Sequence, residues 1–204
     1  MTDVAAASRQ ASRPGHAERG RLSRSSASVR RESCAHGSEE RRDRLPRGRG
    51  CGLLRQIVEC VPNFSEGRDA TVVARIAQAI AQVPGAAVLG QTSDCDHNRS
   101  VITFAGAPAA VAEAAFRGIE SAVALIDMNR HDGVHPRVGA ADVVPLVPIS
   151  GVTMEDCVRL AEQLGERVCR ELRVPVYLYE AAARRPERVN LANVRRERFE
   201  KLRD

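Results

Sequence analysis

From residue 55 onward, short apolar runs alternate with longer amphipathic stretches, and this alternation limits the folds open to the chain more than any other feature. Hydrophobic residues recur at helical spacing over 69–83, 108–126 and 153–172. Short apolar runs typical of strands occupy 56–61, 87–91, 100–104, 142–147 and 175–179. The order βαββαβαβ predicts an α+β fold of the ferredoxin-like sandwich type, with a mixed or antiparallel sheet and helices packed on one face.

Local signals mark the starts of the three expected helices. Asp69 is placed to cap the first helix and Pro108 to open the second. Thr153 and Asp156 fit a capping box at the start of the third. Because aromatic residues make up only 3% of the chain and Trp is absent, the core is expected to consist of Val, Leu, Ile and Ala.

The first 54 residues differ in composition from the rest. Residues 1–50 carry twelve arginines and six acidic residues, a net charge of +6, which leaves −1 for residues 51–204 out of the overall +5. This Arg-, Ser- and Gly-rich segment has few large apolar residues and cannot bury enough surface to order itself. We therefore predict a disordered extension over 1–54 and one folded domain over 55–204.

Three interpretations of the extension stay open. Its arginines and serines are typical of an organelle transit peptide, although the six acidic residues count against that. The arginines would also suit an anionic partner such as nucleic acid, bound without sequence preference. We favour the third interpretation, a stretch translated from a misassigned start that has no function.

Cysteine usage and hydropathy bear on the compartment. The six cysteines form no C-x-x-C pair, and no secretory signal is recognised, which favours reduced thiols and a cytoplasmic location. No stretch approaches the roughly 20 apolar residues of a membrane span, so no membrane partner is expected. Cys60, Cys157 and Cys169 fall in apolar segments and are predicted to be small core residues.

One predicted loop concentrates groups that can carry chemistry, with two histidines, an aspartate and an arginine in the run HDGVHPR at 131–137. Gly133 and Pro136 prevent a continuous helix, and catalytic residues concentrate on loops held by a rigid scaffold. An ordinary imidazole has a pKa of about 6.5, which suits proton transfer near neutral pH. The loop is therefore predicted to be a proton-transfer site beside an anion-binding arginine.

Two plainer interpretations of the histidines have to be weighed. His131 and His135 are four residues apart, a spacing that brings metal ligands together on a helix, but Gly133 and Pro136 argue against a helix and no metal is predicted. Either histidine would otherwise be an ordinary surface or structural residue. No phosphate-binding glycine motif follows a strand, so no nucleotide cofactor is expected.

Several long motifs, in the right order, resemble the N-terminal subdomain of the glutamate formimidoyltransferase family. The resemblance covers about residues 56–200 and is carried by ECVPNFSEG at 59–67, NRS at 98–100, LIDM at 125–128, HDGVHPRVG at 131–139, GVTM at 151–154 and VPVYLY at 174–179. Residues 1–54 lie outside it.

The resemblance implies transfer of a formimidoyl group from formiminoglutamate to N5 of tetrahydrofolate, a co-substrate, in one-carbon metabolism and histidine degradation. It implies that His135, which precedes Pro-Arg in the loop, is the catalytic acid. Attack by N5 on the amidine carbon gives a tetrahedral intermediate. The departing glutamate nitrogen must then receive a proton, which an imidazole can supply.

The same resemblance suggests which residues bind the substrates. Both substrates carry carboxylates, which suit the planar fork of arginine, so Arg99 and Arg137 are predicted to bind them, with structural ion pairs as the alternative. Asn63, Asn98 and His131 lie in matching motifs and complete the predicted substrate-binding set. No metal is implied.

In the family a second, similar subdomain follows, and folate binds between the two. Residues 1–204 contain the first subdomain only, which leaves three functions open. In the first, the chain is the N-terminal half of a transferase that needs a C-terminal subdomain, supplied separately. In the second, it is a non-catalytic folate-binding, ligand-binding or interaction module whose sheet face is covered in a homodimer. In the third, it is a truncated product with neither role.

Overall fold

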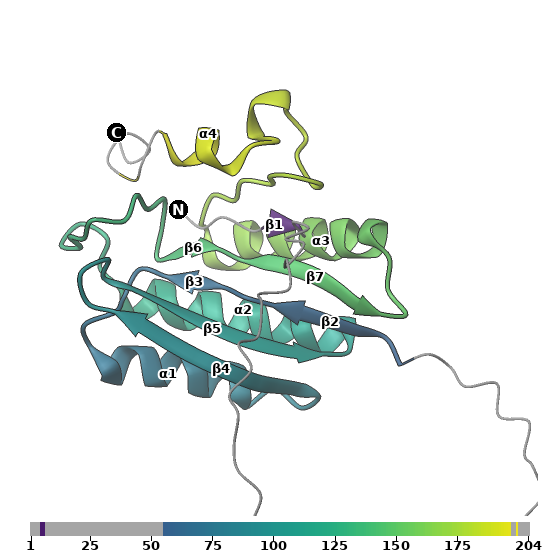
Figure 1. The fold of residues 1–204 in the computed structure, drawn as a ribbon, viewed down its shortest axis with the longest axis horizontal. Helices are drawn as coiled ribbons and strands as arrows, with labels where there is room; N and C mark the ends of the chain where they lie inside the picture. The colour runs from purple at the N-terminus through teal and green to yellow at the C-terminus, as the bar shows by residue number, and fades with distance from the viewer. Residues whose placement is uncertain (1–4, 7–54, 197–198, 200–204) are drawn as a thin grey trace, which may run out of the picture. The chain divides into compact units, whose positions relative to one another are not determined.

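The computed structural model of the chain describes residues 5–6, 55–196 and 199, which form an α+β domain (Figure 1). Its strands are β1 (Ala5–Ala6), β2 (Ile57–Cys60), β3 (Asn63–Phe64), β4 (Ala86–Asp94), β5 (Arg99–Gly106), β6 (Ala141–Val143) and β7 (Pro145–Ser150). Its helices are α1 (Ala70–Ala81), α2 (Pro108–Leu125), α3 (Met154–Leu172), the short 3-10 helix η1 (Pro186–Arg188) and α4 (Leu191–Arg195).

The sheet is built around the central pair β2 and β5. β4 pairs with β5, β5 with β2 and β2 with β7, and each of these pairs is antiparallel. β3 continues the sheet between β5 and β6, also in antiparallel pairs, and β1 adds a parallel pair at β7. The prediction of an α+β fold with an antiparallel sheet is confirmed.

The helices cover one face of the sheet. α1 and α2 lie behind the strands in Figure 1, and α2 also packs against α3. Burial alternates along β5, where Ser100, Ile102 and Phe104 are buried and their neighbours only partly so. The largest fully buried side chains come from both layers: Val58, Phe64, Val73, Ile76, Ile80, Ile102, Phe104, Val111, Ile119, Val138 and Leu146. The core is mainly aliphatic, with Phe64, Phe104 and Phe116 as its phenylalanines, as the composition predicts.

The helix starts follow the local sequence signals. Asp69 Oδ1 accepts hydrogen bonds from Thr71 N at 2.8 Å and from Val72 N at 3.3 Å, capping α1. Pro108 is the first residue of α2, and Thr153 and Asp156 form a reciprocal capping box at α3. Each side-chain cap satisfies backbone N–H groups that the first helical turn leaves unpaired.

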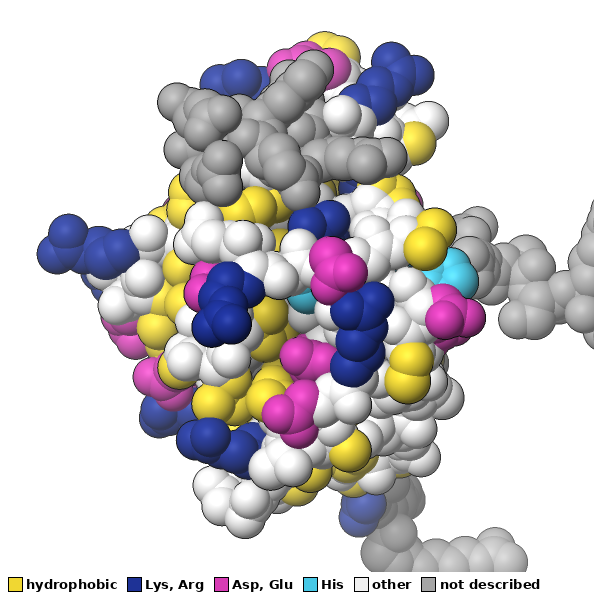
Figure 2. Space-filling view, turned by 90° about the vertical axis from the view of Figure 1, so that its left-hand side faces the viewer, with side chains coloured by type: hydrophobic (Ala, Val, Ile, Leu, Met, Phe, Trp, Pro, Cys, Tyr) yellow, Lys and Arg dark blue, Asp and Glu magenta, His cyan; other side chains and the backbone are white. Residues whose placement is uncertain are grey.

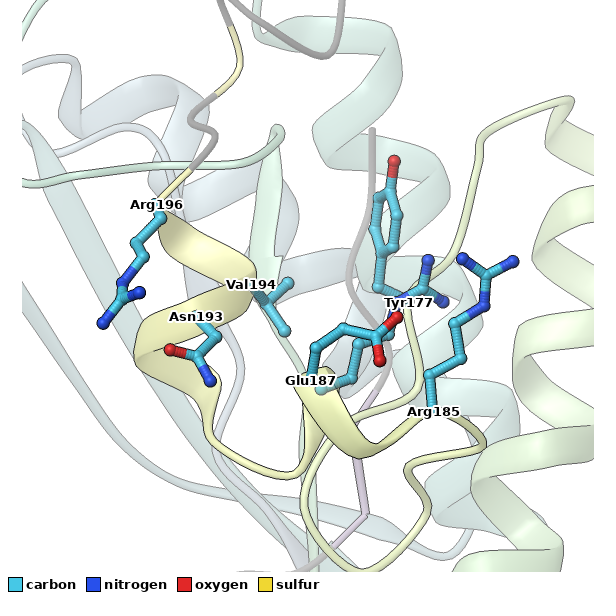
Figure 3. Close-up of a pocket in the computed structure, with 7 residues that line it drawn as sticks. Tyr177, Arg185, Glu187, Asn193, Val194 and Arg196 are labelled. Atoms are coloured by element: carbon cyan, nitrogen blue, oxygen red, sulfur yellow. The ribbon is translucent and has the colours of Figure 1, made fainter.

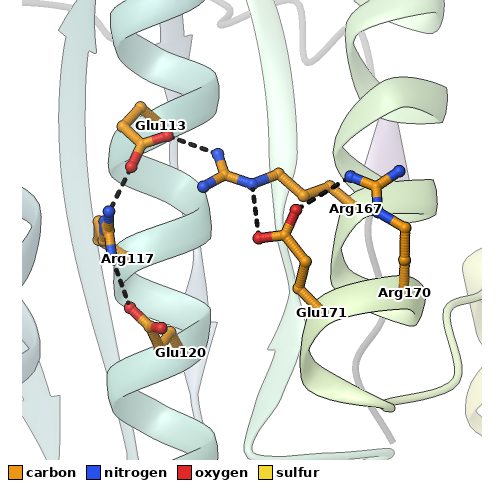
Figure 4. A network of polar contacts seen from close by, with 6 residues as sticks. All are labelled: Glu113, Arg117, Glu120, Arg167, Arg170 and Glu171. Atoms are coloured by element: carbon orange, nitrogen blue, oxygen red, sulfur yellow. Dashed lines mark hydrogen bonds and ion pairs between the residues drawn. The ribbon is translucent and has the colours of Figure 1, made fainter.

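A network of charged side chains joins α2 to α3 (Figure 4). Glu113 on α2 accepts from Arg117 on the same helix at 2.8 Å and from Arg167 on α3. The Arg167 guanidinium also lies over the Phe116 ring, 3.7 Å from its centroid. The Arg167 hydrogen bond holds the pKa of Glu113 below its usual value despite some burial. This contact orients α3 against α2 by charge as well as by packing.

Three expectations about local structure are wrong. The run 175–179 is not a strand, because Val176 and Leu178 pack against Gly165 of α3 instead of pairing with a sheet edge. The strand expected over 142–147 is divided, since β6 pairs with β3 whereas β7 pairs with β2. Cys169 is exposed because it lies on the outer side of α3, although Cys60 and Cys157 are buried as predicted.

Apart from the two residues of β1, the predicted extension over 1–54 lies outside the described residues, and its disorder stays a prediction. Among the described helices, none combines the length and the hydropathy needed to cross a membrane.

Candidate active site

The loop at 131–139 is irregular, as Gly133 and Pro136 predict, and contacts within the domain hold it in place. Arg137, a buried side chain, donates from Nη2 to the carbonyl of His131 at 2.7 Å. At the far end of the loop, Ser65 Oγ donates to the carbonyl of Gly139 at 2.7 Å. Hydrogen bonds therefore link the loop to itself, between Arg137 and His131, and to Ser65, the residue that follows β3.

The β4–β5 turn lies directly against this loop. Val134 N donates to Asp96 O at 3.4 Å, and a Cβ built on Gly133 would lie 2.6 Å from the carbonyl oxygen of His97. No side chain fits in that gap, so the close approach of loop and turn requires glycine at 133. This contact brings the motif at 98–100 next to the motif at 131–139.

Asn98 connects three segments at that junction. Its side-chain Oδ1 accepts from Gly67 N at 2.9 Å, and its Nδ2 donates to the carbonyl of Asp132 at 2.8 Å. The residue is 6% exposed and has a φ of 48°, a left-handed conformation that Asn tolerates better than most residues. Asn98 thus acts as an internal support for the site.

His131 is held as a neutral imidazole. Its Nε2 lies 3.1 Å from the carbonyl oxygen of Asn98, which can only accept, so Nε2 carries the proton. Burial lowers the pKa of His131, and the nearby Arg137 charge acts in the same direction, while the Asn98 hydrogen bond opposes both. Its Nδ1 is buried and has no hydrogen-bond partner among the described residues.

His135 lies between a cation and an anion. Its Nε2 is 3.4 Å from Arg99 Nη1 and 3.6 Å from Asp142 Oδ2, and its side chain is 16% exposed. The ring of His97 lies beside it, with the centroids 6.2 Å apart. An unprotonated Nε2 accepts from Arg99, and a protonated Nε2 faces the Asp142 carboxylate. One ring nitrogen of His135 is therefore close to both a guanidinium and a carboxylate.

Asp142 supplies a buried negative charge to the site. Its side chain is 1% exposed, accepts from Val138 N at 2.8 Å and from Arg195 Nη2 at 2.6 Å. Burial alone would raise the pKa of Asp142, but the contact with His135, the Arg195 charge and the Val138 N–H together hold it below its usual value. The carboxylate is thus ionised at neutral pH and places a negative charge beside His135.

Five of the six predicted site residues gather here, and one lies apart. His131, His135, Arg99, Arg137 and Asn98 are linked by the contacts above. Asn63 on β3 donates to Val61 O at 3.1 Å, and the described residues show no side-chain bond from it to the other five. Figure 2, which views the molecule from the left-hand side of Figure 1, shows arginine and acidic side chains close together on this face, with hydrophobic side chains beside them.

The sequence interpretation missed Asp142, Arg195 and His97. Asp142 lies in β6, only three residues after the loop at 131–139 ends, and this closeness in sequence could have identified it as a candidate. Arg195 lies 53 residues after Asp142, at the end of α4 in an arginine-rich part of the sequence, where no local signal distinguishes it. Within the described part of the chain, no group of three or more His, Cys, Asp or Glu side chains lies close enough to hold a metal ion.

Comparison with known proteins decides the family. A family model described as the formiminotransferase domain, N-terminal subdomain, matches residues 57–204. The chain belongs to the formiminotransferase family. Within this formiminotransferase subdomain, the segments at 59–67, 98–100 and 131–139 meet through Ser65, Gly67 and Asn98.

Curated relatives extend beyond the formiminotransferase subdomain. The chain is 54% identical over 144 residues to the glutamate formimidoyltransferase of Thermoplasma acidophilum. The aligned region covers 71% of this chain and 48% of that protein. It is 47% identical over 147 residues to the Streptococcus pyogenes glutamate formimidoyltransferase, 72% of this chain and 49% of the relative. The Sus scrofa formimidoyltransferase-cyclodeaminase is 49% identical over 149 residues, 28% of its length. The chain thus spans about half the length of the first two relatives.

Proposed function

We propose that this subdomain takes part in moving a formimidoyl group from formiminoglutamate to tetrahydrofolate, with His135 as the proton carrier. The observation that carries the proposal is the position of His135 Nε2, 3.4 Å from Arg99 Nη1 and 3.6 Å from Asp142 Oδ2. Membership of the formiminotransferase family and the names of the Thermoplasma acidophilum and Streptococcus pyogenes relatives support the choice of reaction.

The proposed reaction returns His135 to its starting state. N5 of tetrahydrofolate attacks the amidine carbon, forms the new C–N bond and gives up its proton to the imidazole. The C–N bond to glutamate then breaks, and the imidazolium delivers that proton to the departing nitrogen. Asp142 stabilises the cation between the two steps, and proton transfer of this kind contributes about 10²–10⁴ in rate.

Substrate carboxylates are assigned first to Arg99. Its guanidinium is half-buried beside His135, where it would hold an anionic group next to the proton carrier. Arg137, Asn98 and His131 each bind the protein itself, so we propose that they shape the loop under the substrate. Asn63 stays a proposed substrate ligand on the strength of its motif alone.

We propose that activity requires a second subdomain. The first two relatives are about twice as long as the matched region, which leaves room for one. β4 is exposed along nearly its whole length, with the Leu89 side chain 62% exposed, so the sheet offers an apolar surface at this edge. The proposed location of the complex is the cytoplasm.

A transfer assay tests this function. The full chain is incubated with formiminoglutamate and tetrahydrofolate, alone and with the C-terminal half of the Thermoplasma acidophilum relative, and released glutamate is measured. We expect release in the mixture and its loss in the His135→Asn variant. Absence of glutamate release from every combination of correctly folded halves would contradict the proposal.

The second candidate is a ligand-binding module without turnover. The coverage of only half of each glutamate formimidoyltransferase relative favours it, because one wall of the site would then be absent. Saturable binding of tetrahydrofolate without glutamate release, in both the chain alone and the mixture, would decide for this alternative.

The ferredoxin-like connectivity is also proposed here. The order β2-α1-β4-β5-α2-β7 along the chain, with β4-β5-β2-β7 adjacent in antiparallel pairs, supports it. A crystal structure of residues 55–204 with the same strand order would test this assignment.

A further inference from the structure

A second hollow lies in the C-terminal part of the domain, apart from His135. It has a volume of about 400 Å³ and is lined by residues from the segment after α3, from η1 with its preceding residue, and from α4 with the residue that follows it (Figure 3). Its polar lining comes from Tyr177, Arg185, Glu187, Arg188, Asn193 and Arg196. The formimidoyl-transfer proposal uses none of these residues.

The charge of this lining is strongly positive. Among the described residues that line it, three arginines and one glutamate, Glu187, give a net charge of +2. Hollows of a few hundred cubic ångströms with a small number of convergent polar groups are typical of small-molecule sites. A small anion is the ligand that such walls attract.

Ion pairing distinguishes the three arginines of the lining from seven other arginines in the described part of the chain. Seven arginines lie within ion-pair distance of a carboxylate, namely Arg68, Arg117, Arg159, Arg167, Arg170, Arg184 and Arg195. In the part of the chain that the structure describes, Arg185, Arg188 and Arg196 have no such carboxylate, although Glu187 shares their hollow. The lining carries more positive than negative charge, and an external anion would offset that excess.

Arg188 is the best-positioned of the three. Its guanidinium lies over the Tyr177 ring, 4.7 Å from the centroid, and the residue is only partly exposed. Stacking on an aromatic face holds the guanidinium plane while leaving its N–H edges free to bind a planar or tetrahedral oxyanion. The Asn193 side chain, across the hollow in Figure 3, adds an amide donor.

We propose that this hollow binds the oxyanion end of a small molecule, a carboxylate or a phosphate. The site borders the proton-transfer site without being part of it, because α4 carries Asn193 to the hollow and Arg195 to Asp142. The proposal does not depend on formimidoyl transfer, since it concerns binding at residues outside that mechanism.

Binding of two probes to the full chain tests the proposal. Glutarate and inorganic phosphate are titrated separately at constant ionic strength, and binding is measured by calorimetry. We expect saturable binding of at least one probe, weakened about tenfold or more in the Arg185→Gln/Arg188→Gln double variant, because each loses a charge-assisted contact. A preference for glutarate identifies a carboxylate ligand, and a preference for phosphate identifies a phosphate ligand.

Matched variants separate this site from general charge effects. Arg75→Gln removes one exposed arginine of α1 that lies outside the hollow, and it should leave the affinity unchanged. Arg188→Lys should bind more weakly than the native chain, because lysine keeps the charge but loses the fork. Thermal melts confirm that each variant is folded. The proposal is overturned if neither probe saturates, if Arg75→Gln weakens binding as much as the double variant, or if Arg99→Gln alone abolishes it.

Discussion

The Oδ2 atom of Asp142 lies 3.6 Å from Nε2 of His135, with the carboxylate 1% exposed and the imidazole 16% exposed. The same oxygen lies 2.6 Å from Arg195 Nη2, so one buried carboxylate serves both a histidine and an arginine. The contacts of Asp142 with His135 and Arg195 offset its burial and keep it ionised. The candidate site therefore depends on α4 as well as on the loop.

Replacement of His135 should separate chemistry from stability. His135→Ala is expected to lower formimidoyl transfer by about 10²–10⁴-fold with only a small change in thermal stability, because this loop imidazole contacts charged side chains and not the hydrophobic core. His131→Ala should cost less in rate but more in stability, since His131 is half-buried and bonded to Asn98. Rates of both variants are measured at matched folding. Equal rate losses would mean that the two histidines act as a unit.

Asp142→Asn should weaken both the site and the fold. The change leaves Arg195 without its carboxylate in a largely buried contact, which is expected to cost about 3 kcal/mol in unfolding free energy. Urea unfolding measures this loss. Asp132→Asn is the matched control, because its ion pair with Arg68 is exposed and should contribute less than about 1 kcal/mol. Similar losses from the two variants would show that the buried carboxylate has no special role.

Stability should fall as the solution is acidified. Burial holds the pKa of His131 below its usual 6.5, so the unfolded chain takes up that proton first and the unfolding free energy declines as pH drops below 6.5. Asp142 acts in the same direction below its ordinary pKa of 3.8, because its pKa is also lowered in the folded state. Urea unfolding between pH 7 and pH 5 should show a shallower decline for His131→Gln. An unchanged slope would exclude a contribution from this imidazole.

Thiol reactivity should follow burial. Burial raises the pKa of Cys60 well above its usual value and that of Cys157 to about 11, so both thiols should resist alkylation in the folded chain. Cys95 and Cys169 are exposed and should react first. Peptide mass mapping after brief treatment with N-ethylmaleimide identifies the labelled positions, and a sample unfolded in urea provides full labelling. Early modification of Cys157 would contradict the packing of α3.

The contact between α2 and α3 should be measurable in stability. Arg167→Ala removes both the ion pair with Glu113 and the stacking on Phe116, and should lower the unfolding free energy by about 1–2 kcal/mol. Arg170→Ala serves as control, because Arg170 is exposed and its pair with Glu171 should contribute little to stability. Equal losses of stability from the two variants would mean that the network of Figure 4 contributes no more than an exposed ion pair.

Elements whose signals are local could be predicted from the sequence. The caps at Asp69, Pro108 and Thr153 each act within a few residues, so the starts of α1, α2 and α3 follow from them. The run at 175–179 could not be assigned in this way. Alternating apolar residues are compatible both with a strand at a sheet edge and with an irregular segment packed on a helix. Which of the two forms depends on the space beside Gly165 of α3, where Val176 and Leu178 pack.

The sequence by itself determined the α+β order and the irregular loop at 131–139, because residue type and spacing along the chain carry those properties. Within that loop, only the resemblance to a known family singled out His135. Only the tertiary structure decided what surrounds His135. Arg99 starts β5, Asp142 lies in β6 and Arg195 lies in α4, and side-chain contacts across 36 to 53 residues join them. Such contacts are set by how the sheet and the helices pack, since no local pattern reports which distant charge will compensate a buried carboxylate.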